Sequence, residues 1–210
     1  MTRYRNICEL IIKGDLLELN TPLQHINLED IADSKLILDI GGGGEGLVSR
    51  IAGSRVCAVD YRISEIREAR IHNPPAYWFV ADGCYLPFKS NSFDCVTLWF
   101  SLGYMSTLSI KKQVLKSAFH SLKQGGLISI LASRIDCKEE RFIFQALFTL
   151  PDGTESKVGY GVRGNQNQTI SSIGAIMVEI GFQDIQIEDH DWWFEIWASK
   201  KEVSRLGAKP

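Results

Sequence analysis

The sequence predicts an α/β protein with a doubly wound, mostly parallel seven-stranded sheet, an antiparallel C-terminal strand and an inserted β-hairpin. Three observations predict this class. From residue 35 onward, short apolar runs alternate with segments of helical period, glycines follow the first run, and two alternating segments flank a turn after residue 140. The 210 residues suffice for one domain with a substantial core. We therefore expect a single domain.

Five apolar runs predict the parallel strands. Each is short and ends at glycine or polar residues, as expected of strands buried on both faces. They are KLILDI (35–40), RVCAVD (55–60), YWFVAD (77–82), SFDCVTLWFSL (92–102) and LISILAS (127–133). Helical spacing at 62–72 and 109–123 separates several of them, and right-handed crossovers then make the strands parallel.

The two ends of the chain depart from this alternation. Near-helical spacing over residues 3–19 and from Leu28 to Ala32 predicts two N-terminal helices. Period-two alternation on both sides of a PDG turn predicts the hairpin, and a helix with two strands closes the chain. The expected parts are a helical cap (1–33), a core (35–133), the inserted hairpin (141–163) and a closing helix and strand pair (169–199).

Composition and charge narrow the classes of partner. The net charge of −2 leaves no basic stripe for nucleic acid, which favours a small-molecule partner. The five cysteines show no CxxC pair or short Cys/His spacing, so no metal site is expected and the thiols indicate a reducing compartment. The N-terminus has no signal-peptide pattern and no run reaches membrane-spanning length. We expect a cytoplasmic protein without a membrane partner.

Ligand-binding residues are expected directly after the strands, because a doubly wound sheet binds ligands at the carboxyl ends. The first strand ends at Asp39 and leads into Gly41 and Gly43, whose bare backbone lets a ligand approach closely. Asp60 ends the second strand, 19 residues after Gly41, where an acid can hold both hydroxyls of a ribose. The glycines and this acid indicate a nucleoside-containing ligand.

The other acids indicate which nucleoside this is. Asp39 would repel a pyrophosphate and favour a positively charged group such as an ammonium. Asp82, just after the third strand, can accept a hydrogen bond from the exocyclic amine of adenine. Adenine, ribose and an ammonium together describe S-adenosylmethionine.

Four stretches resemble the class I S-adenosylmethionine-dependent methyltransferases in order and spacing. They are LILDIGGGGEG, VCAVDYR, FVADGCYLPFKSNSFDCVTLWFSLGYM and LKQGGLISIL, within residues 35–133. The resemblance implies a Rossmann-like fold and methyl transfer to a small molecule. It also implies that Asp39 contacts the methionyl amino group, that Gly41 and Gly43 line the cofactor, and that Asp60 holds the ribose. Tyr61 would lie along the adenine.

The same resemblance assigns the remaining site residues. Asp82 and Gly83 would read the adenine edge, while Phe100 and Ser101 would border the methionine moiety and its methyl group. Glu45 stands where the family commonly has a third glycine. It is compatible with the adjoining helix start, and a contact with the methionyl amine is a second interpretation that stays open.

The residues indicate no catalytic base. Methyl transfer to an amine or thiolate does not need one. The candidates considered for a base are His25, His72, His120, His190 and Tyr104, and none is assigned. The N-terminal cap and the hairpin, with Arg163 at its end, are the regions free to select the acceptor; the hairpin is equally well a sheet extension. The Trp-rich segment at 192–197 is expected in the core or at a homodimer interface.

Two other functions share features with this one. A nicotinamide-dependent oxidoreductase also uses a glycine loop and a ribose acid, but Asp39 opposes its pyrophosphate. A non-catalytic module that binds S-adenosylmethionine and supports a partner protein is favoured by the absence of an evident base.

Overall fold

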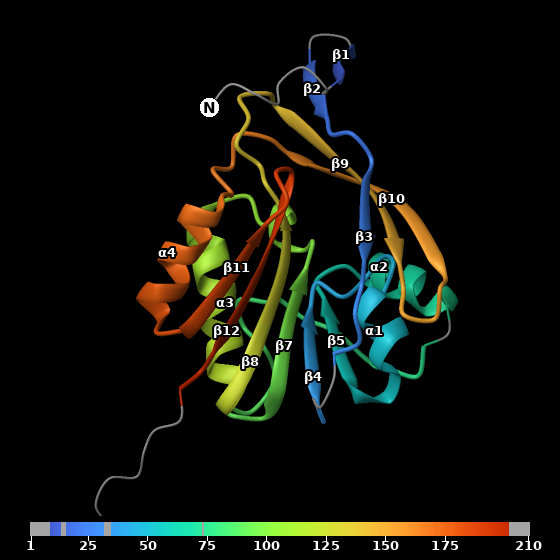
Figure 1. Cartoon of the computed structure of the whole chain (residues 1–210). Coiled ribbons are helices and arrows are strands. Elements are labelled where there is room, and N and C mark those ends of the chain that lie inside the picture. The colour runs from blue at the N-terminus through green and yellow to red at the C-terminus, as the bar shows by residue number, and fades with distance from the viewer. Residues whose placement is uncertain (1–8, 14–15, 32–34, 73, 202–210) are drawn as a thin grey trace, which may run out of the picture.

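The structure is a computed structural model that describes residues 9–13, 16–31, 35–72 and 74–201 (Figure 1). It contains two sheets, and the larger one has seven strands. The strand order is β11-β12-β8-β7-β4-β5-β6, with the five strands from β8 to β6 parallel and β12 antiparallel to both neighbours. The strands are β4 (Ile37–Ile40), β5 (Val56–Asp60), β6 (Tyr77–Val80), β7 (Phe93–Trp99), β8 (Leu122–Ser133), β11 (Gln183–Asp189) and β12 (Trp193–Ser199). This order confirms the predicted fold class.

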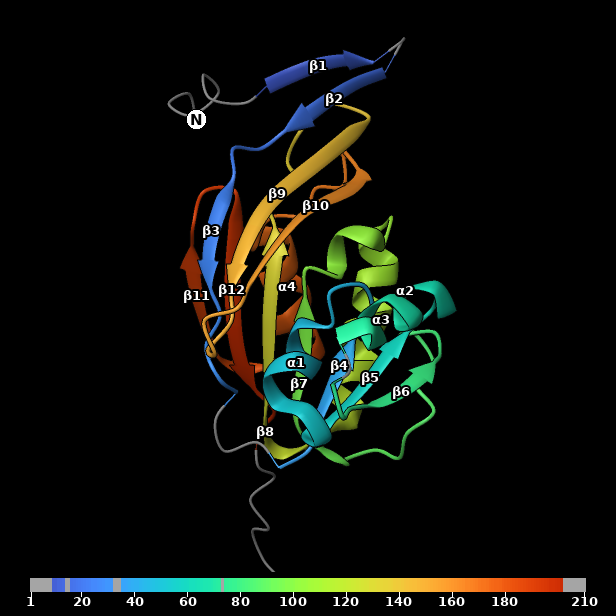
Figure 2. The same ribbon diagram turned by 90° about the vertical axis from the view of Figure 1, so that its right-hand side faces the viewer.

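Helices cover both faces of this sheet (Figures 1 and 2). The apolar faces of α3 and α4 join one core with β4, β7, β8 and β12, whereas α1 packs on the opposite face against β4 and β5. The α-helices are α1 (Leu47–Ala52), α2 (Ile63–Ala69), α3 (Leu108–Ser121) and α4 (Ile170–Ile180), and the 3-10 helices are η1 (Gly53–Arg55), η2 (Arg70–His72) and η3 (Leu102–Tyr104). Within the described ranges, none of these helices has the length and apolar character needed to cross a membrane.

Side-chain caps explain where the two long helices begin. The Thr107 hydroxyl accepts a hydrogen bond from the amide of Ile110 at 3.2 Å, and α3 starts at the next residue after Thr107. Thr169 and Ser172 form a reciprocal capping box at the start of α4. Gly181, with φ of +107°, ends α4 in the left-handed region, as its sequence position predicts.

The second sheet joins the predicted hairpin to the N-terminal segment. Its order is β1-β2-β9-β10, and β3 also pairs with β9. Its strands are β1 (Glu9–Lys13), β2 (Leu16–Asn20), β3 (Gln24–Asn27), β9 (Arg141–Thr149) and β10 (Glu155–Arg163). The β9–β10 hairpin is confirmed, and it is part of a five-stranded sheet in which β9 is central and β10 lies at one edge.

The predicted N-terminal helical cap is wrong. Residues 9–13, 16–20 and 24–27 are strands, residues 28–31 are not helical, and the rest of the predicted cap lies outside the described residues. β2 and β3 pair in parallel with successive parts of β9, so the hairpin edge satisfies their backbone groups. Local periodicity could not reveal this pairing, because the partner strand lies more than 100 residues further along the chain.

The second sheet packs over the carboxyl ends of the first. Apolar side chains of β9 and β10 share a core with residues of α1, β8 and β12 and with Phe100, which follows β7. Trp193 of β12 is 8% exposed and belongs to this core, as the core-packing interpretation of the Trp-rich segment expects. β1 and β2 extend away from the larger sheet in both views (Figures 1 and 2). The hairpin therefore forms a second layer above the strand ends where a ligand is expected.

Candidate functional site

A cavity of about 450 Å³ opens at the carboxyl ends of the parallel strands. Its walls come mainly from residues at the ends of β4, β5, β6 and β7 and from the segments that follow, as expected for a doubly wound sheet. All ten residues predicted as cofactor-binding line it: Asp39, Gly41, Gly43, Glu45, Asp60, Tyr61, Asp82, Gly83, Phe100 and Ser101. The fold thus gathers the complete predicted set in one place.

The glycine loop turns over the end of β5 directly after β4. The amides of Gly41 and Gly42 both donate to the carbonyl of Val59, at 2.7 and 3.1 Å. Gly41 has φ of +77°, and a Cβ there would clash with the side chain of Ser101. Bare backbone is therefore required to bring this loop against the segment that follows β7.

Asp39 places a buried carboxylate beneath the loop. It is 2% exposed, and its Oδ1 accepts a hydrogen bond of 2.7 Å from the hydroxyl of Thr97. Its Oδ2 is buried and has no hydrogen-bond partner among the described residues. Burial raises the pKa of Asp39 from 3.8 to about 7; the Thr97 hydrogen bond opposes this rise and the charge of Asp60 adds to it. A cation at Oδ2 would be stabilised, whereas an anion would be repelled.

Asp60 holds its carboxylate at the opposite side of the loop. Its Oδ1 accepts from the amide of Arg62 at 2.9 Å, and its Oδ2 accepts from the amide of Gly43 at 3.3 Å. Each carboxylate oxygen keeps a second lone pair, so the pair can accept from two neighbouring hydroxyls. A Cβ on residue 43 would lie 2.7 Å from Oδ2, so glycine is needed for the contact between loop and acid.

Asp82 and Gly83 border a part of the cavity with an apolar floor. The Oδ1 of Asp82 accepts from the amide of Cys84 at 2.8 Å, which orients its exposed carboxylate. A Cβ on Gly83 would lie 3.0 Å from Cγ2 of Ile40, so the backbone packs closely on an apolar floor. Tyr61 is 76% exposed at the rim. An apolar floor with a hydrogen-bond acceptor at its edge suits a planar ring that carries an amino group.

Phe100 and Ser101 form the wall nearest the second sheet. Phe100 has φ of +55°, an uncommon backbone conformation for this residue type, and is 4% exposed. Its ring stacks on Phe144 of β9 and on Tyr160 of β10, with centroids 5.2 and 5.6 Å apart. The Oγ of Ser101 is buried without a hydrogen-bond partner among the described residues, as is Oδ2 of Asp39. Two unpaired oxygens therefore belong to cavity-lining residues, as a site for a polar ligand requires.

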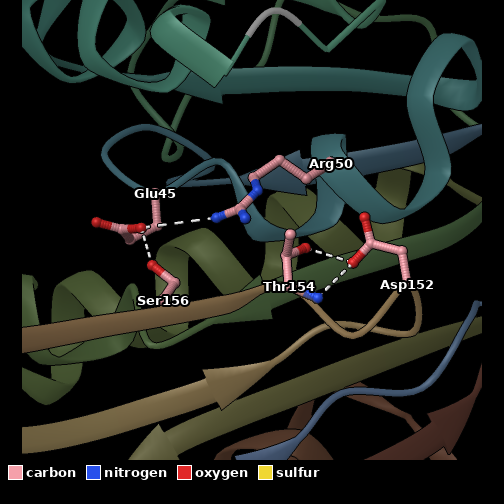
Figure 3. A network of polar contacts seen from close by, with 5 residues as sticks. All are labelled: Glu45, Arg50, Asp152, Thr154 and Ser156. Atoms are coloured by element: carbon pink, nitrogen blue, oxygen red, sulfur yellow. Dashed lines mark hydrogen bonds and ion pairs between the residues drawn. The ribbon is translucent and has the colours of Figure 1, made fainter.

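Glu45 connects the glycine loop to the second sheet (Figure 3). Its Oε2 accepts a hydrogen bond from the hydroxyl of Ser156 on β10, and Arg50 of α1 approaches the same atom at 3.8 Å. Asp152 and Thr154, in and after the β9–β10 turn, are hydrogen-bonded to each other beside Arg50 (Figure 3). Glu45 thus contacts the hairpin through Ser156 and the α1 helix through Arg50. A glycine at this position would give backbone freedom but neither contact.

Several cavity residues were missed or left unassigned by the sequence reasoning. Tyr160 lies within the predicted hairpin (141–163), but the sequence could not show which face of its strand it is on without the partner sheet. Tyr104, considered as a substrate contact, does line the cavity. The guanidinium of Arg62 lies 5.6 Å from the centre of the Tyr104 ring and 3.3 Å from Oε1 of Glu65. Arg62 therefore links these two residues, which both line the cavity. His25 is exposed on β3 and does not line the cavity.

Residues 38–130 match a family model described as a methyltransferase domain. This match is a likeness of the segment to methyltransferase domains, and it agrees with the resemblance found in the sequence. The ubiquinone/menaquinone biosynthesis C-methyltransferase UbiE of Saccharophagus degradans is 33% identical over 117 residues, which are 50% of this chain and 46% of that protein. The chain therefore spans about half the length of this curated relative.

Solved structures share the fold at low sequence identity. A methyltransferase from Methanosarcina mazei has a TM-score of 0.60 at 18% identity, over 83% of this chain and 95% of that one. A phosphoethanolamine N-methyltransferase from Haemonchus contortus, solved with S-adenosyl-L-methionine, has a TM-score of 0.58 at 18% identity, over 80% of this chain and 49% of that one. These likenesses confirm the Rossmann-like fold class.

Proposed function

We propose that this protein is an S-adenosylmethionine-dependent methyltransferase that acts on a small molecule. The observation that carries the proposal is the buried, unpaired Oδ2 of Asp39 in the cavity beside the glycine loop, with Asp60 on the other side of that loop. Two acids at these places suit an ammonium and a ribose. The methyltransferase family model over residues 38–130 supports the same function.

Each part of the cofactor has a matching group in the cavity. We assign the methionyl ammonium to Asp39, the ribose hydroxyls to Asp60, and the adenine amine to Asp82 above the floor at Gly83. Gly41 and Gly43 admit the amino-acid arm, and Tyr61 lies at the adenine rim. Phe100 and Ser101 border the methionine moiety, where the unpaired Oγ of Ser101 can donate to the cofactor carboxylate.

The residues of the chain act mainly by positioning. When bound, S-adenosylmethionine would supply an activated methyl group: an acceptor atom would bond to the methyl carbon in line with the carbon–sulfur bond, which breaks so that S-adenosylhomocysteine leaves. The two acids fix the ends of the cofactor, and the second sheet with Phe100 covers the methionine end and excludes water. Correct orientation of two reactants contributes up to about 7–11 kcal/mol to lowering a barrier. No catalytic base is assigned, and none is needed for an amine or thiolate acceptor.

Two alternative functions can be distinguished from methyl transfer, one by Asp39 and one by turnover. A nicotinamide dinucleotide would place its pyrophosphate at the glycine loop, next to the buried carboxylate of Asp39. A non-catalytic module would bind the cofactor without turnover. Formation of S-adenosylhomocysteine from S-adenosylmethionine with any acceptor distinguishes an enzyme from such a module. A homodimer and the absence of a nucleic-acid partner stay predictions.

Calorimetric titration with S-adenosylhomocysteine tests the proposal. We expect the wild type to bind, and Asp60→Ala to weaken binding about 10- to 100-fold through loss of charged hydrogen bonds. The matched control is Asp30→Ala, because Asp30 pairs with Arg55 at 3.1 Å and does not line the cavity. Its affinity should stay within twofold. No binding by the wild type, or binding of a nicotinamide dinucleotide instead, contradicts the proposal.

A further inference from the structure

Tyr160 is the one residue of the second sheet among those that line the cavity in the described part of the chain. Every other lining residue belongs to a strand of the larger sheet or to a loop or helix that connects two of its strands. Its ring lies nearly parallel to Phe100, at 9° with centroids 5.6 Å apart, and contacts Phe148 at 6.2 Å. Aromatic contacts with β9 and with the segment that follows β7 therefore hold this side chain in a fixed position.

Anchors at both ends of β10 hold Tyr160 over the cavity. Four residues before it, and on the same face of the strand, Ser156 donates to Glu45 of the glycine loop (Figure 3). Beyond its other end, Gln166 is 6% exposed and donates from Nε2 to the carbonyl of Gly103 at 2.8 Å. Gly103 belongs to η3, which ends at Tyr104. The hairpin is thus tied to both segments between which Tyr160 lies.

The hydroxyl of Tyr160 has no hydrogen-bond partner among the residues that the structure describes. Burial raises the pKa of Tyr160 above its ordinary value, and the charges of Glu45, Tyr104 and Asp39 raise this pKa further. The phenol therefore stays protonated at neutral pH and carries a proton that it can donate. A ligand oxygen or nitrogen is the partner that this donor lacks.

The charges around the cavity are unequal. Its lining includes five carboxyl side chains and one basic side chain, Arg62. The carboxyls are those of Asp39, Glu45, Asp60, Glu65 and Asp82. The guanidinium of Arg62 is already held by Glu65 and by the Tyr104 ring. Arg163, considered from the sequence as a contact for an anion, is exposed and does not line the cavity. With the cofactor assigned to Asp39, Asp60 and Asp82, the remaining carboxyls are Glu45 and Glu65, which pair with Arg50 and Arg62. The described lining residues therefore leave no unpaired cationic side chain for an acceptor with a negative charge.

We propose that Tyr160 is the acceptor-contacting residue of this site: its hydroxyl donates a hydrogen bond to the acceptor, and the acceptor is a ring-containing molecule without negative charge. This inference rests on the proposed methyltransferase function. The ring of Tyr160, held by stacking on Phe100, supplies aromatic surface for the ring of the acceptor, and an anion would find no unpaired cationic side chain among the described lining residues. The hairpin therefore selects the substrate rather than only extending the sheet.

Three probes with one ring and different charge test this proposal: p-cresol (neutral), tyramine (cationic) and 4-hydroxyphenylacetate (anionic). Each is titrated by ligand-observed NMR into protein saturated with S-adenosylhomocysteine. We expect the neutral and cationic probes to bind at least about tenfold more tightly than the anion. Equal or tighter binding of the anion overturns the proposal, as does failure of all three to bind to the cofactor-loaded protein.

Tyr160→Phe removes only the hydroxyl and keeps the ring on Phe100. We expect about fivefold weaker binding of p-cresol and tyramine, with affinity for S-adenosylhomocysteine unchanged within twofold. The matched control is Tyr85→Phe, because Tyr85 is 77% exposed and does not line the cavity. Unchanged probe affinity in Tyr160→Phe, or an equal loss of cofactor affinity, overturns the assignment. Binding of S-adenosylhomocysteine by the wild type is measured first, so failure there counts against the proposed function itself.

Discussion

The hydroxyl of Thr97 donates a 2.7 Å hydrogen bond to Oδ1 of Asp39 and leaves the other carboxylate oxygen unpaired. The two residues are register partners on the adjacent parallel strands β4 and β7, and Thr97 is fully buried. The backbone pairing of the sheet therefore sets the orientation of the carboxylate. One oxygen is fixed by the protein and one remains for a ligand, which is the arrangement that a cation-binding acid needs.

Cofactor affinity should rise with pH through neutrality. The pKa of Asp39 is about 7 in the empty protein, and only the ionised form attracts an ammonium. Between pH 6 and pH 8 the ionised fraction rises about tenfold, so we expect about tenfold tighter binding of S-adenosylhomocysteine by calorimetry. Asp39→Asn should bind more weakly and lose most of this pH dependence. A wild-type affinity that is flat over this range contradicts the role of Asp39.

Asp39 should also make the empty protein less stable at higher pH. Its pKa in the folded state lies above the unfolded value of 3.8, so the folded state binds the extra proton between these values. This contribution to stability is fully present below pH 3.8 and is lost as pH rises through about 7. At pH 8, urea denaturation should show Asp39→Asn to be more stable than the wild type by roughly 2–4 kcal/mol, with a much smaller difference at pH 4. A difference that does not change with pH contradicts this prediction.

Two glycine substitutions separate the needs of the site from the needs of the fold. Gly43→Ala would place a Cβ 2.7 Å from Oδ2 of Asp60, so we expect binding of S-adenosylhomocysteine to fall at least about 100-fold. Gly174→Ala is the matched control, because a Cβ there meets nothing within 4 Å on α4. It should keep cofactor affinity and raise the free energy of unfolding by about 0.5–1 kcal/mol. Normal binding by Gly43→Ala would show that the loop tolerates a side chain.

Lys111 ties the α3 helix to the rim of the cavity. It is fully buried, and its Nζ donates to the carbonyl of Met105 and to Oε1 of Gln166, both at 2.6 Å. Burial lowers the pKa of Lys111 to about 8. Lys111→Ala should reduce the free energy of unfolding by about 2–4 kcal/mol, because it leaves a cavity and an unpaired buried acceptor. Lys116→Ala, on the exposed face of the same helix, should change it by less than about 0.5 kcal/mol. Similar effects of both variants would contradict this role.

A pair of variants identifies the role of Glu45. Ser156→Ala removes the hairpin partner of Glu45, whereas Glu45→Gln also removes its charge. If Glu45 acts through the hairpin, both should weaken S-adenosylhomocysteine binding by a similar factor, about two- to fivefold, and speed amide hydrogen exchange in β10. Ser90→Ala, at an exposed position after β6, is the control and should change neither. A much larger loss in Glu45→Gln than in Ser156→Ala would assign Glu45 to the methionyl amine instead.

The central sheet and the set of cavity residues followed from local features of the sequence. Apolar runs that end in acids or glycines identify buried strands and the edge of the sheet where the functional residues lie. Because helices alternate with these strands and crossovers are right-handed, the strands must be parallel. The positions of Asp39, Asp60 and Asp82 relative to the strands were therefore predictable. The ends of α4 were predictable as well, because Thr169 and Gly181 act on neighbouring backbone groups.

Only the tertiary structure decided which part of the chain covers the cavity. The N-terminal segment was predicted as helical, but the free edge of β9 pairs with it as strands, and such pairing depends on a segment distant in the chain. The same pairing chose which face of β10 looks into the cavity, and so placed Tyr160 beside Phe100 and Ser156 beside Glu45. Strand patterns repeat every two residues and leave the choice of face to the partner sheet. The sequence by itself thus determined the cofactor end of the site, through residues next to their own strands, while the acceptor end required contacts between two sheets.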